Sequence, residues 1–184
     1  MNIRSNEELI EYVNRGNKVK YVFFWSDQKP ESGISKTCFS QWYESEFELD
    51  GIKYQTAEHF MMAEKARLFG DSEIEARVIQ AFGPAEAKRL GRAVRNFDED
   101  IWKEKRFEIV VRANMAKFGQ CPELQQFLLN TEDCVLVEAS AVDNIWGIGL
   151  IEDDPRAENP NSWRGINLLG FALMETRNRL MREK

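Results

Sequence analysis

The chain has 184 residues, of which 43% are hydrophobic, and it carries a formal net charge of −6 at pH 7. This length and composition fit one globular domain with a substantial core, and they exclude a disordered chain. The acidic balance provides no basic field, which argues against bulk electrostatic binding to nucleic acid but leaves a local basic groove open.

Several common types of chemistry and location are excluded by simple counts. The three cysteines, Cys38, Cys121 and Cys134, form no close pair, so we expect free thiols in a reducing cytosol and a cytoplasmic protein. The N-terminal residues have no signal-peptide pattern, and no apolar run approaches transmembrane length. His59 is the single histidine, and neither a P-loop nor a GxGxxG sequence follows a strand. We therefore predict no metal and no cofactor.

The first part of the chain predicts one helix followed by a small antiparallel sheet. Residues 5–14 have the pattern of a short capped helix. The predicted strands are rich in β-branched and aromatic residues, and Asp50-Gly51 is a turn signal between the last two of them. These strands cover residues 19–25, 38–43, 46–49 and 52–54.

Residues 54–70 predict a helix with clear ends. Thr56 can cap its start through the side-chain hydroxyl, and Gly70 supplies the left-handed residue that closes its end. Glu58 and Lys65 are seven residues apart, so only about 20° separates them around the helix axis. Both charged side chains therefore lie on one face of a largely apolar helix.

Two interpretations of this charged pair are open. In the first, Glu58 is a first-turn acid favoured by the helix dipole, and Lys65 extends to water from an apolar base. In the second, the helix is a pocket wall that carries a proton donor and a nucleophilic amine. The first interpretation is the usual one, because charges are seldom fully buried.

Four further helices are predicted before the last third of the chain. Ser72 and Glu75 have capping-box spacing at the start of the first, and Asp98 can cap the third. The four helices cover residues 72–81, 85–90, 98–117 and 122–129. Four cations gather around the second helix, where a solvated basic face is the ordinary interpretation and a phosphate clamp the alternative. They are Lys88, Arg89, Arg92 and Arg95.

The last third combines a strand, a glycine-rich segment and a long helix. The strand at 135–140 leads through Asp143 to Trp146-Gly147-Ile148-Gly149. These glycines would let backbone approach a flat ligand while the indole stacks on it, although an ordinary tight turn would use them as well. An acidic loop at 151–162 follows, and a lid or a disordered segment is typical of that length.

The last helix is predicted over about residues 164–183. Arg177 interrupts its apolar stripe, and a guanidinium in that position needs an anionic or carbonyl partner. Asn167, near the start of this helix, offers amide hydrogen bonds.

Eight blocks of the sequence, in order from Phe39 to Arg177, belong to one pattern. The blocks are Phe39-Ser40-Gln41-Trp42; Asp50-Gly51 with Tyr54; Thr56-Ala57-Glu58-His59 with Lys65-Ala66; Ala87-Lys88-Arg89-Leu90-Gly91-Arg92; Lys117-Phe118; Glu138-Ala139-Ser140; Asp143 with Trp146-Gly147-Ile148-Gly149; and Gly165-Ile166-Asn167-Leu168-Leu169-Gly170 through Met174 and Arg177. In these blocks the chain resembles the NADAR (YbiA-like) family. It departs from many relatives at Ser40-Gln41-Trp42, where they have Ser-Asn-Phe.

The resemblance implies a fold, an activity and a class of substrate. The fold would be α+β, a predominantly helical single domain over 1–184 with a small antiparallel sheet. The activity would be that of an N-glycoside hydrolase. Relatives cleave the base–ribose bond of phosphoribosylamino-pyrimidine intermediates of riboflavin synthesis, or remove ADP-ribose from guanine bases. The partner would be a nucleotide-like small molecule, with ADP-ribosylated nucleic acid as a further candidate, and no membrane.

Cleavage of an N-glycoside needs protonation of the leaving group and capture of an oxocarbenium-like carbon. We expect Glu58 to act as general acid/base and Lys65 to capture C1 of the opened sugar as an imine. Asp143 would orient the ribose hydroxyls or the attacking water, and in an alternative route without an imine it would activate water directly. The expected substrate-binding residues are Gln41, Arg92, Trp146, Gly147, Gly149, Asn167 and Arg177.

Among these binding residues, Trp146 would stack on the base, and Arg177 and Arg92 would hold phosphate. A non-catalytic module that binds ADP-ribose or NAD is the alternative function. Such a module would need Trp146, its neighbouring glycines and Arg177, but it would not need Glu58 or Lys65. The presence of both therefore favours the enzyme.

Overall fold

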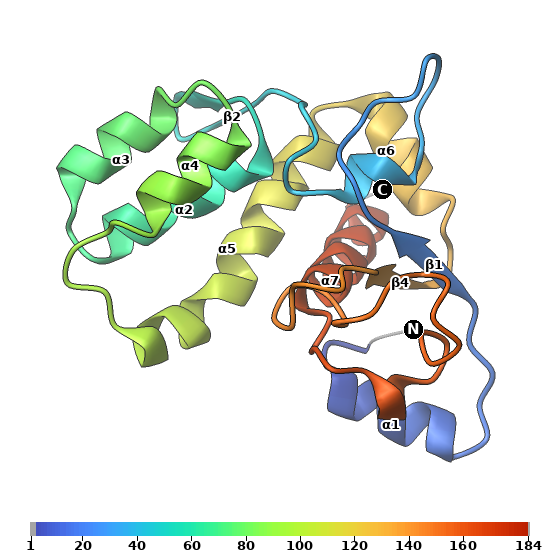
Figure 1. Cartoon of the computed structure of the whole chain (residues 1–184). Helices are drawn as coiled ribbons and strands as arrows, with labels where there is room; N and C mark the ends of the chain where they lie inside the picture. Colours follow the sequence, from blue (N-terminus) through green and yellow to red (C-terminus); the bar gives the residue numbers. More distant parts are fainter. Residues whose placement is uncertain (1–2, 184) are drawn as a thin grey trace. The chain divides into compact units, whose positions relative to one another are not determined.

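The computed structural model describes residues 3–183, and within them the chain divides into two compact units. The central unit is the continuous stretch 41–121. The terminal unit combines both ends of the chain, up to Ser40 and from Pro122 on. Seven α-helices and four short strands in the described residues confirm the predicted, mainly helical α+β class (Figure 1). No described helix is long and apolar enough to cross a membrane.

The terminal unit is built around a pair of parallel strands. Its elements are α1 (Asn6–Asn14), β1 (Tyr21–Phe24), the 3₁₀ helix η1 (Lys36–Phe39), α6 (Pro122–Leu129), β4 (Val135–Glu138), the 3₁₀ helix η2 (Pro160–Ser162) and α7 (Leu168–Arg182). Tyr21 lies opposite Val135 and Phe24 opposite Glu138. The expectation that the strand at 19–25 belongs to one antiparallel sheet with the strands that follow it is therefore wrong, because β1 pairs in parallel with β4 in a sheet of its own. The whole central unit is inserted between the two strands, and such a long connection allows parallel pairing, which a short hairpin does not.

The central unit is built around α2 (Ala57–Leu68), which packs against the three other helices of this unit. The remaining elements are β2 (Phe47–Leu49), β3 (Ile52–Tyr54), α3 (Ser72–Ile79), α4 (Pro84–Gly91) and α5 (Glu99–Gly119). Strands β2 and β3 form the predicted antiparallel hairpin. Asp50 and Gly51 have φ of 53° and 76° in its turn, as a two-residue hairpin of matching twist requires.

Both predicted ends of α2 are confirmed. The Thr56 hydroxyl accepts a hydrogen bond from the backbone N–H of His59 at 3.3 Å, and Gly70 has a φ of 70° just after the helix. Eight of its twelve residues are buried, so the helix is enclosed on more than one side, as its apolar pattern indicates.

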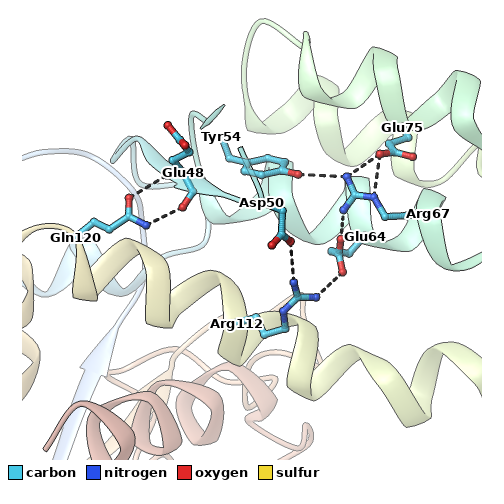
Figure 2. A network of polar contacts seen from close by, with 8 residues as sticks. All are labelled: Glu48, Asp50, Tyr54, Glu64, Arg67, Glu75, Arg112 and Gln120. Atoms are coloured by element: carbon cyan, nitrogen blue, oxygen red, sulfur yellow. Dashed lines mark hydrogen bonds and ion pairs between the residues drawn. The ribbon is translucent and has the colours of Figure 1, made fainter. Parts of the chain in front are cut away.

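An ion-pair network connects α2 to its neighbours on the side of Glu64 (Figure 2). Arg112 of α5 lies 2.8 Å from Glu64 and 3.2 Å from Asp50 in the hairpin turn. Arg67 of α2 contacts the same Glu64 and lies 2.6 Å from Glu75 of α3. These groups are partly exposed, so each pair contributes at most about 1 kcal/mol. The network connects α2 to α3, to α5 and to the hairpin turn.

Three local predictions are wrong. Residues 38–43 form no strand, because the Ser35 side chain accepts the N–H of Thr37 and starts the 3₁₀ helix η1 instead. Helix α3 is capped by Asp71 rather than Ser72. Helix α7 begins only at Leu168, because Asn167 has a left-handed φ of 53°, which an α-helix cannot include.

Candidate active site

Glu58 lies in the first turn of α2 and is only 3% exposed. Its backbone N–H donates to the carbonyl oxygen of Gln41 at 3.0 Å, which ties the start of the helix to the preceding chain. A carboxylate at this end of a helix is stabilised by the unpaired N–H groups. A solvated surface acid would be exposed, so the burial of Glu58 favours the pocket-wall interpretation.

Gln41 contacts the start of this helix through its backbone and α5 through its side chain. Its side chain is buried, and its Oε1 accepts a hydrogen bond from Nδ2 of Asn114 on α5 at 2.9 Å. The same Asn114 Nδ2 lies 2.9 Å from the carbonyl of Val110. Gln41 thus links α5 to the start of α2, because its own carbonyl oxygen accepts the N–H of Glu58.

Lys65 lies in the last turn of α2, on the face that carries Glu58. Its Nζ is 4.2 Å from the centroid of the Phe97 ring and 5.6 Å from that of Trp102. In the part of the chain that the structure describes, no carboxylate lies within ion-pair distance of this amine. An ammonium between aromatic faces is stabilised by their quadrupoles but loses hydration.

The charge state of Lys65 follows from these surroundings. Burial lowers the pKa of its ammonium below the ordinary lysine value. Among nearby charges, Glu99 and Glu58 raise this pKa and Arg92 lowers it. The neutral, nucleophilic amine is therefore formed at lower pH than in an exposed lysine.

The cations of the basic cluster around α4 differ in whether they pair with a carboxylate. Arg95 donates to the buried carboxylate of Asp71 through its backbone N–H at 2.9 Å and its Nε at 3.0 Å. Arg89 lies 3.6 Å from Glu86, in a looser and exposed pair. Arg95 is therefore structural, and a phosphate clamp on this helix would depend on the other two cations, Lys88 and Arg92.

Arg92 ends α4 and is exposed, and within residues 3–183 it forms no ion pair. Lys88, one turn earlier, places its Nζ 5.7 Å from the centroid of the Trp42 ring. The end of α4 lies close to the face of α2 that carries Glu58 and Lys65, since a side chain on Gly91 would overlap the sulfur of Met62. Met62 lies between Glu58 and Lys65 on that face.

The terminal unit holds the other candidates, and most of their polar groups bind backbone. Oδ1 of Asp143 accepts the N–H groups of Ile145 at 2.9 Å and Trp146 at 2.8 Å, which closes a tight turn. Asp143 therefore fixes the start of the Trp146 segment. Trp146 is half-buried, and its carbonyl accepts the N–H of Leu169 at 3.1 Å.

The two glycines after Trp146 serve the close packing of this loop. A Cβ on Gly147 would lie 2.9 Å from the carbonyl oxygen of Glu138, and one on Gly149 would overlap Oδ1 of Asn144. Gly149 also has a φ of 70°, where glycine is favoured. The tight-turn interpretation thus explains both glycines without a ligand.

Asn167 and Arg177 are also occupied by protein groups. Nδ2 of Asn167 donates to the carbonyl of Leu136 at 2.9 Å, and its Oδ1 accepts the N–H of Glu138 at 3.0 Å, so the side chain pairs with β4 like a short strand. Arg177 is 1% exposed and donates to Oγ1 of Thr131 at 2.7 Å and to the carbonyl of Cys134 at 3.0 Å. The predicted need of Arg177 for a carbonyl partner is confirmed.

The candidates thus form two groups, each within one unit. Gln41, Glu58, Lys65 and Arg92 are in the central unit, and the other six are in the terminal unit. Sequence reasoning did not single out Phe97, because its ring reaches Lys65 from a loop far along the chain and no fixed spacing signals that contact. Within residues 3–183, no group of three or more His, Cys, Asp or Glu side chains could hold a metal ion.

The chain is similar to known proteins over most of its length. A NADAR domain model matches residues 23–181, which run through both units. N-glycosidase R617 of Acanthamoeba polyphaga mimivirus is 42% identical over 163 residues, covering 86% of this chain and 95% of that protein. N-glycosidase YbiA of Escherichia coli (strain K12) is 31% identical over 146 residues, covering 79% and 82%. The NMR structure of the E. coli protein YbiA has a TM-score of 0.70 at 27% identity, covering 91% and 88%.

Proposed function

Because this chain belongs to the NADAR family, we propose that it cleaves the base–ribose bond of a phosphoribosylamino-pyrimidine or of an ADP-ribosylated guanine, with Glu58 and Lys65 as catalytic residues. At the coarser level the chain is a hydrolase that acts on N-glycosyl compounds, the class of its named relatives. The observation that supports the residue assignment is a buried carboxylate and a half-buried amine on one face of α2.

The first step requires a proton for the leaving base. Glu58 is fixed at the start of α2 by the hydrogen bond between its N–H and Gln41, and a proton donor needs such a defined position. As the leaving nitrogen takes the proton from Glu58, the C1–nitrogen bond can break without forming an anionic base.

The second step captures the sugar. The neutral Nζ of Lys65 attacks C1, so a C1–Nζ bond forms as the base departs. The bond between C1 and the ring oxygen then breaks, the ring oxygen takes a proton from Nζ, and the opened sugar is held as an imine. Water then adds to this imine, the C1–Nζ bond breaks, and the free sugar aldehyde and the free amine are regenerated. The lowered pKa of Lys65 supports this role, since only the unprotonated amine can attack.

The exposed Arg92 binds the phosphate, and Lys88 lies one turn away on the same face of α4. Arg177, the other residue expected to hold phosphate, already donates to Thr131 and Cys134 in the interior, and we propose a structural role for it. Stacking of the base on Trp146 and orientation of the ribose or water by Asp143 stay predictions. Direct activation of water by Asp143 is the competing route.

A panel of N-ribosides tests the proposal. Purified protein is incubated with phosphoribosylamino-pyrimidines, ADP-ribosylated guanosine and ordinary nucleosides, and free base is detected by mass spectrometry. We expect base release from one of the first two substrates and none from Glu58→Gln under the same conditions. If ADP-ribose or NAD binds but no substrate releases its base, the non-catalytic binding module is the better account.

A further inference from the structure

We infer that Phe97 is a positioning residue: the face of its ring holds the Lys65 amine beside Trp102, on the side of α2 that carries Glu58. The inference rests on the proposed role of Lys65 as nucleophile. It assigns a function to an aromatic residue that no part of the proposed chemistry uses directly.

The geometry of the contact is that of a cation–π pair. The Nζ of Lys65 lies 4.2 Å from the Phe97 centroid, within the range of about 6 Å in which such pairs are attractive. Trp102, on α5, contributes a second and more distant ring at 5.6 Å. Trp102 is buried, whereas Phe97 is 40% exposed, so Phe97 is the outer wall of the site occupied by the amine.

The position of Phe97 is braced from two sides. Asp71, which follows α2 and caps α3, accepts three hydrogen bonds from Arg95, two residues before Phe97. The ring of Phe69, at the end of α2, meets the Phe97 ring edge to face, with centroids 5.3 Å apart. The loop between α4 and α5 therefore presents Phe97 in a defined orientation, which a positioning residue requires.

The charges that face Lys65 explain why a ring is used in this position. Glu58 on α2 and Glu99 on α5 attract the ammonium, and Arg92 at the end of α4 repels it. A neutral ring holds the ammonium without offering a carboxylate that would pair with it. When the amine loses its proton the cation–π attraction ends, and Nζ becomes available to attack.

The test measures the ionisation of Lys65 without a substrate. Trace labelling with acetic anhydride over a pH series, followed by peptide mapping, reports the titration of each lysine in the intact chain. Phe97→Leu removes the ring but keeps apolar bulk, and Phe97→Tyr keeps a ring. Phe82→Leu is the matched control, since Phe82 is 95% exposed in the same unit and has no ring contact in the described residues.

We expect Phe97→Leu to shift the Lys65 titration to lower pH by about half a unit, the size expected for a lost cation–π contact. Its kcat should fall severalfold at unchanged KM, because Phe97 acts on the lysine and not on the substrate. Phe97→Tyr should restore both values, and Phe82→Leu should change neither. If Phe97→Leu is unfolded by circular dichroism, Phe97→Met replaces it with the same expected result.

Two contrary results have different meanings. An unchanged Lys65 titration and kcat in the folded, ring-free variant would overturn the positioning role. A shifted titration in that variant, together with full turnover by Lys65→Arg, would leave the contact intact but refute the imine chemistry of the proposed function.

Discussion

The two units use their polar candidate residues in different ways. In the central unit, Glu58 and Lys65 lie on a regular helix whose interior backbone groups pair with one another. In the terminal unit, Asp143 and Asn167 lie in or beside irregular loops, and their side chains form hydrogen bonds with backbone groups. The difference teaches that a helix does not need its side chains to satisfy its interior backbone, whereas these loop residues bind the backbone of their own loop.

The largest effect is expected at Lys65, and it tests most directly whether the residues of α2 carry the chemistry. Borohydride added during turnover should reduce the imine and attach the sugar covalently to Lys65, as seen by peptide mapping. Lys65→Arg should lose both trapping and turnover, because guanidinium stays protonated and cannot attack. Lys105→Arg, an exposed lysine of the same unit, should keep both.

The rate of this borohydride trapping should also change with pH in a defined direction. Trapping requires the neutral amine, and burial lowers the pKa of Lys65, so the trapping rate should rise with pH and level off below the ordinary lysine value of about 10.4. If nothing is trapped and Lys65→Arg turns over well, the lysine is an electrostatic or structural group. Water activation by Asp143 would then be the better mechanism.

The next effect concerns the acid. Glu58→Gln keeps the shape of the buried side chain but removes its proton transfer, so turnover should fall by about 10²–10⁴-fold in a folded protein. Steady-state rates and circular dichroism measure the two properties separately. Glu104→Gln, at an exposed position on α5, serves as the control. Near-wild-type turnover in Glu58→Gln would remove Glu58 from the mechanism.

Asn167→Ala tests whether the candidate residues of the terminal unit have a structural role. It leaves the carbonyl of Leu136 and the N–H of Glu138 without their partner, so the free energy of unfolding should fall by about 2–4 kcal/mol. Urea denaturation measures this loss, and the KM of the folded variant should not change. A stable variant with a raised KM would instead place Asn167 in contact with the substrate. It would contradict the proposed difference between the two units.

Trp146→Ala asks whether the terminal unit also contributes to binding. If the indole stacks on the base, affinity should fall by roughly 1–3 kcal/mol, the range for base–aromatic stacking. Calorimetry with a base-containing ligand and with ribose phosphate separates the possibilities, since only the first should be weakened. Equal losses for both ligands would indicate that Trp146 is a packing residue.

The smallest effect is the acid sensitivity introduced by His59, the chain's single histidine. Its Nδ1 lies 2.8 Å from the Thr56 hydroxyl and its Nε2 lies 3.1 Å from the carbonyl of Ala81, and burial lowers its pKa. The histidine of the unfolded chain then takes up a proton near pH 6.5, whereas the buried His59 of the folded chain takes it up only at lower pH. Stability should therefore fall as pH drops below about 6.5, by at most about 1.4 kcal/mol per unit.

Urea denaturation between pH 5 and 7.5 measures this slope, and His59→Gln is the comparison variant. The slope should be reduced in His59→Gln. An identical slope in the two proteins would assign the acid sensitivity to the carboxylates of the chain instead.

Local rules were sufficient to predict the helices and the hairpin. Caps at Thr56 and Asp98, the Asp50-Gly51 turn and helical periodicity all depend on neighbours within a few residues, and the structure confirms them. The common face of Glu58 and Lys65 follows from the helical repeat alone. The family blocks likewise could be read along the chain, and the domain match confirms the family.

Long-range packing determined the strand pairing and the partners of the candidate site residues. The parallel pairing of β1 with β4 and the ring of Phe97 over Lys65 join residues that no spacing rule connects. The sequence identifies Asn167 and Arg177 as polar residues that need partners, but only the fold determines which buried backbone groups lack partners of their own. A side chain's chemistry is thus encoded locally, whereas its availability depends on what the rest of the chain leaves unsatisfied around it.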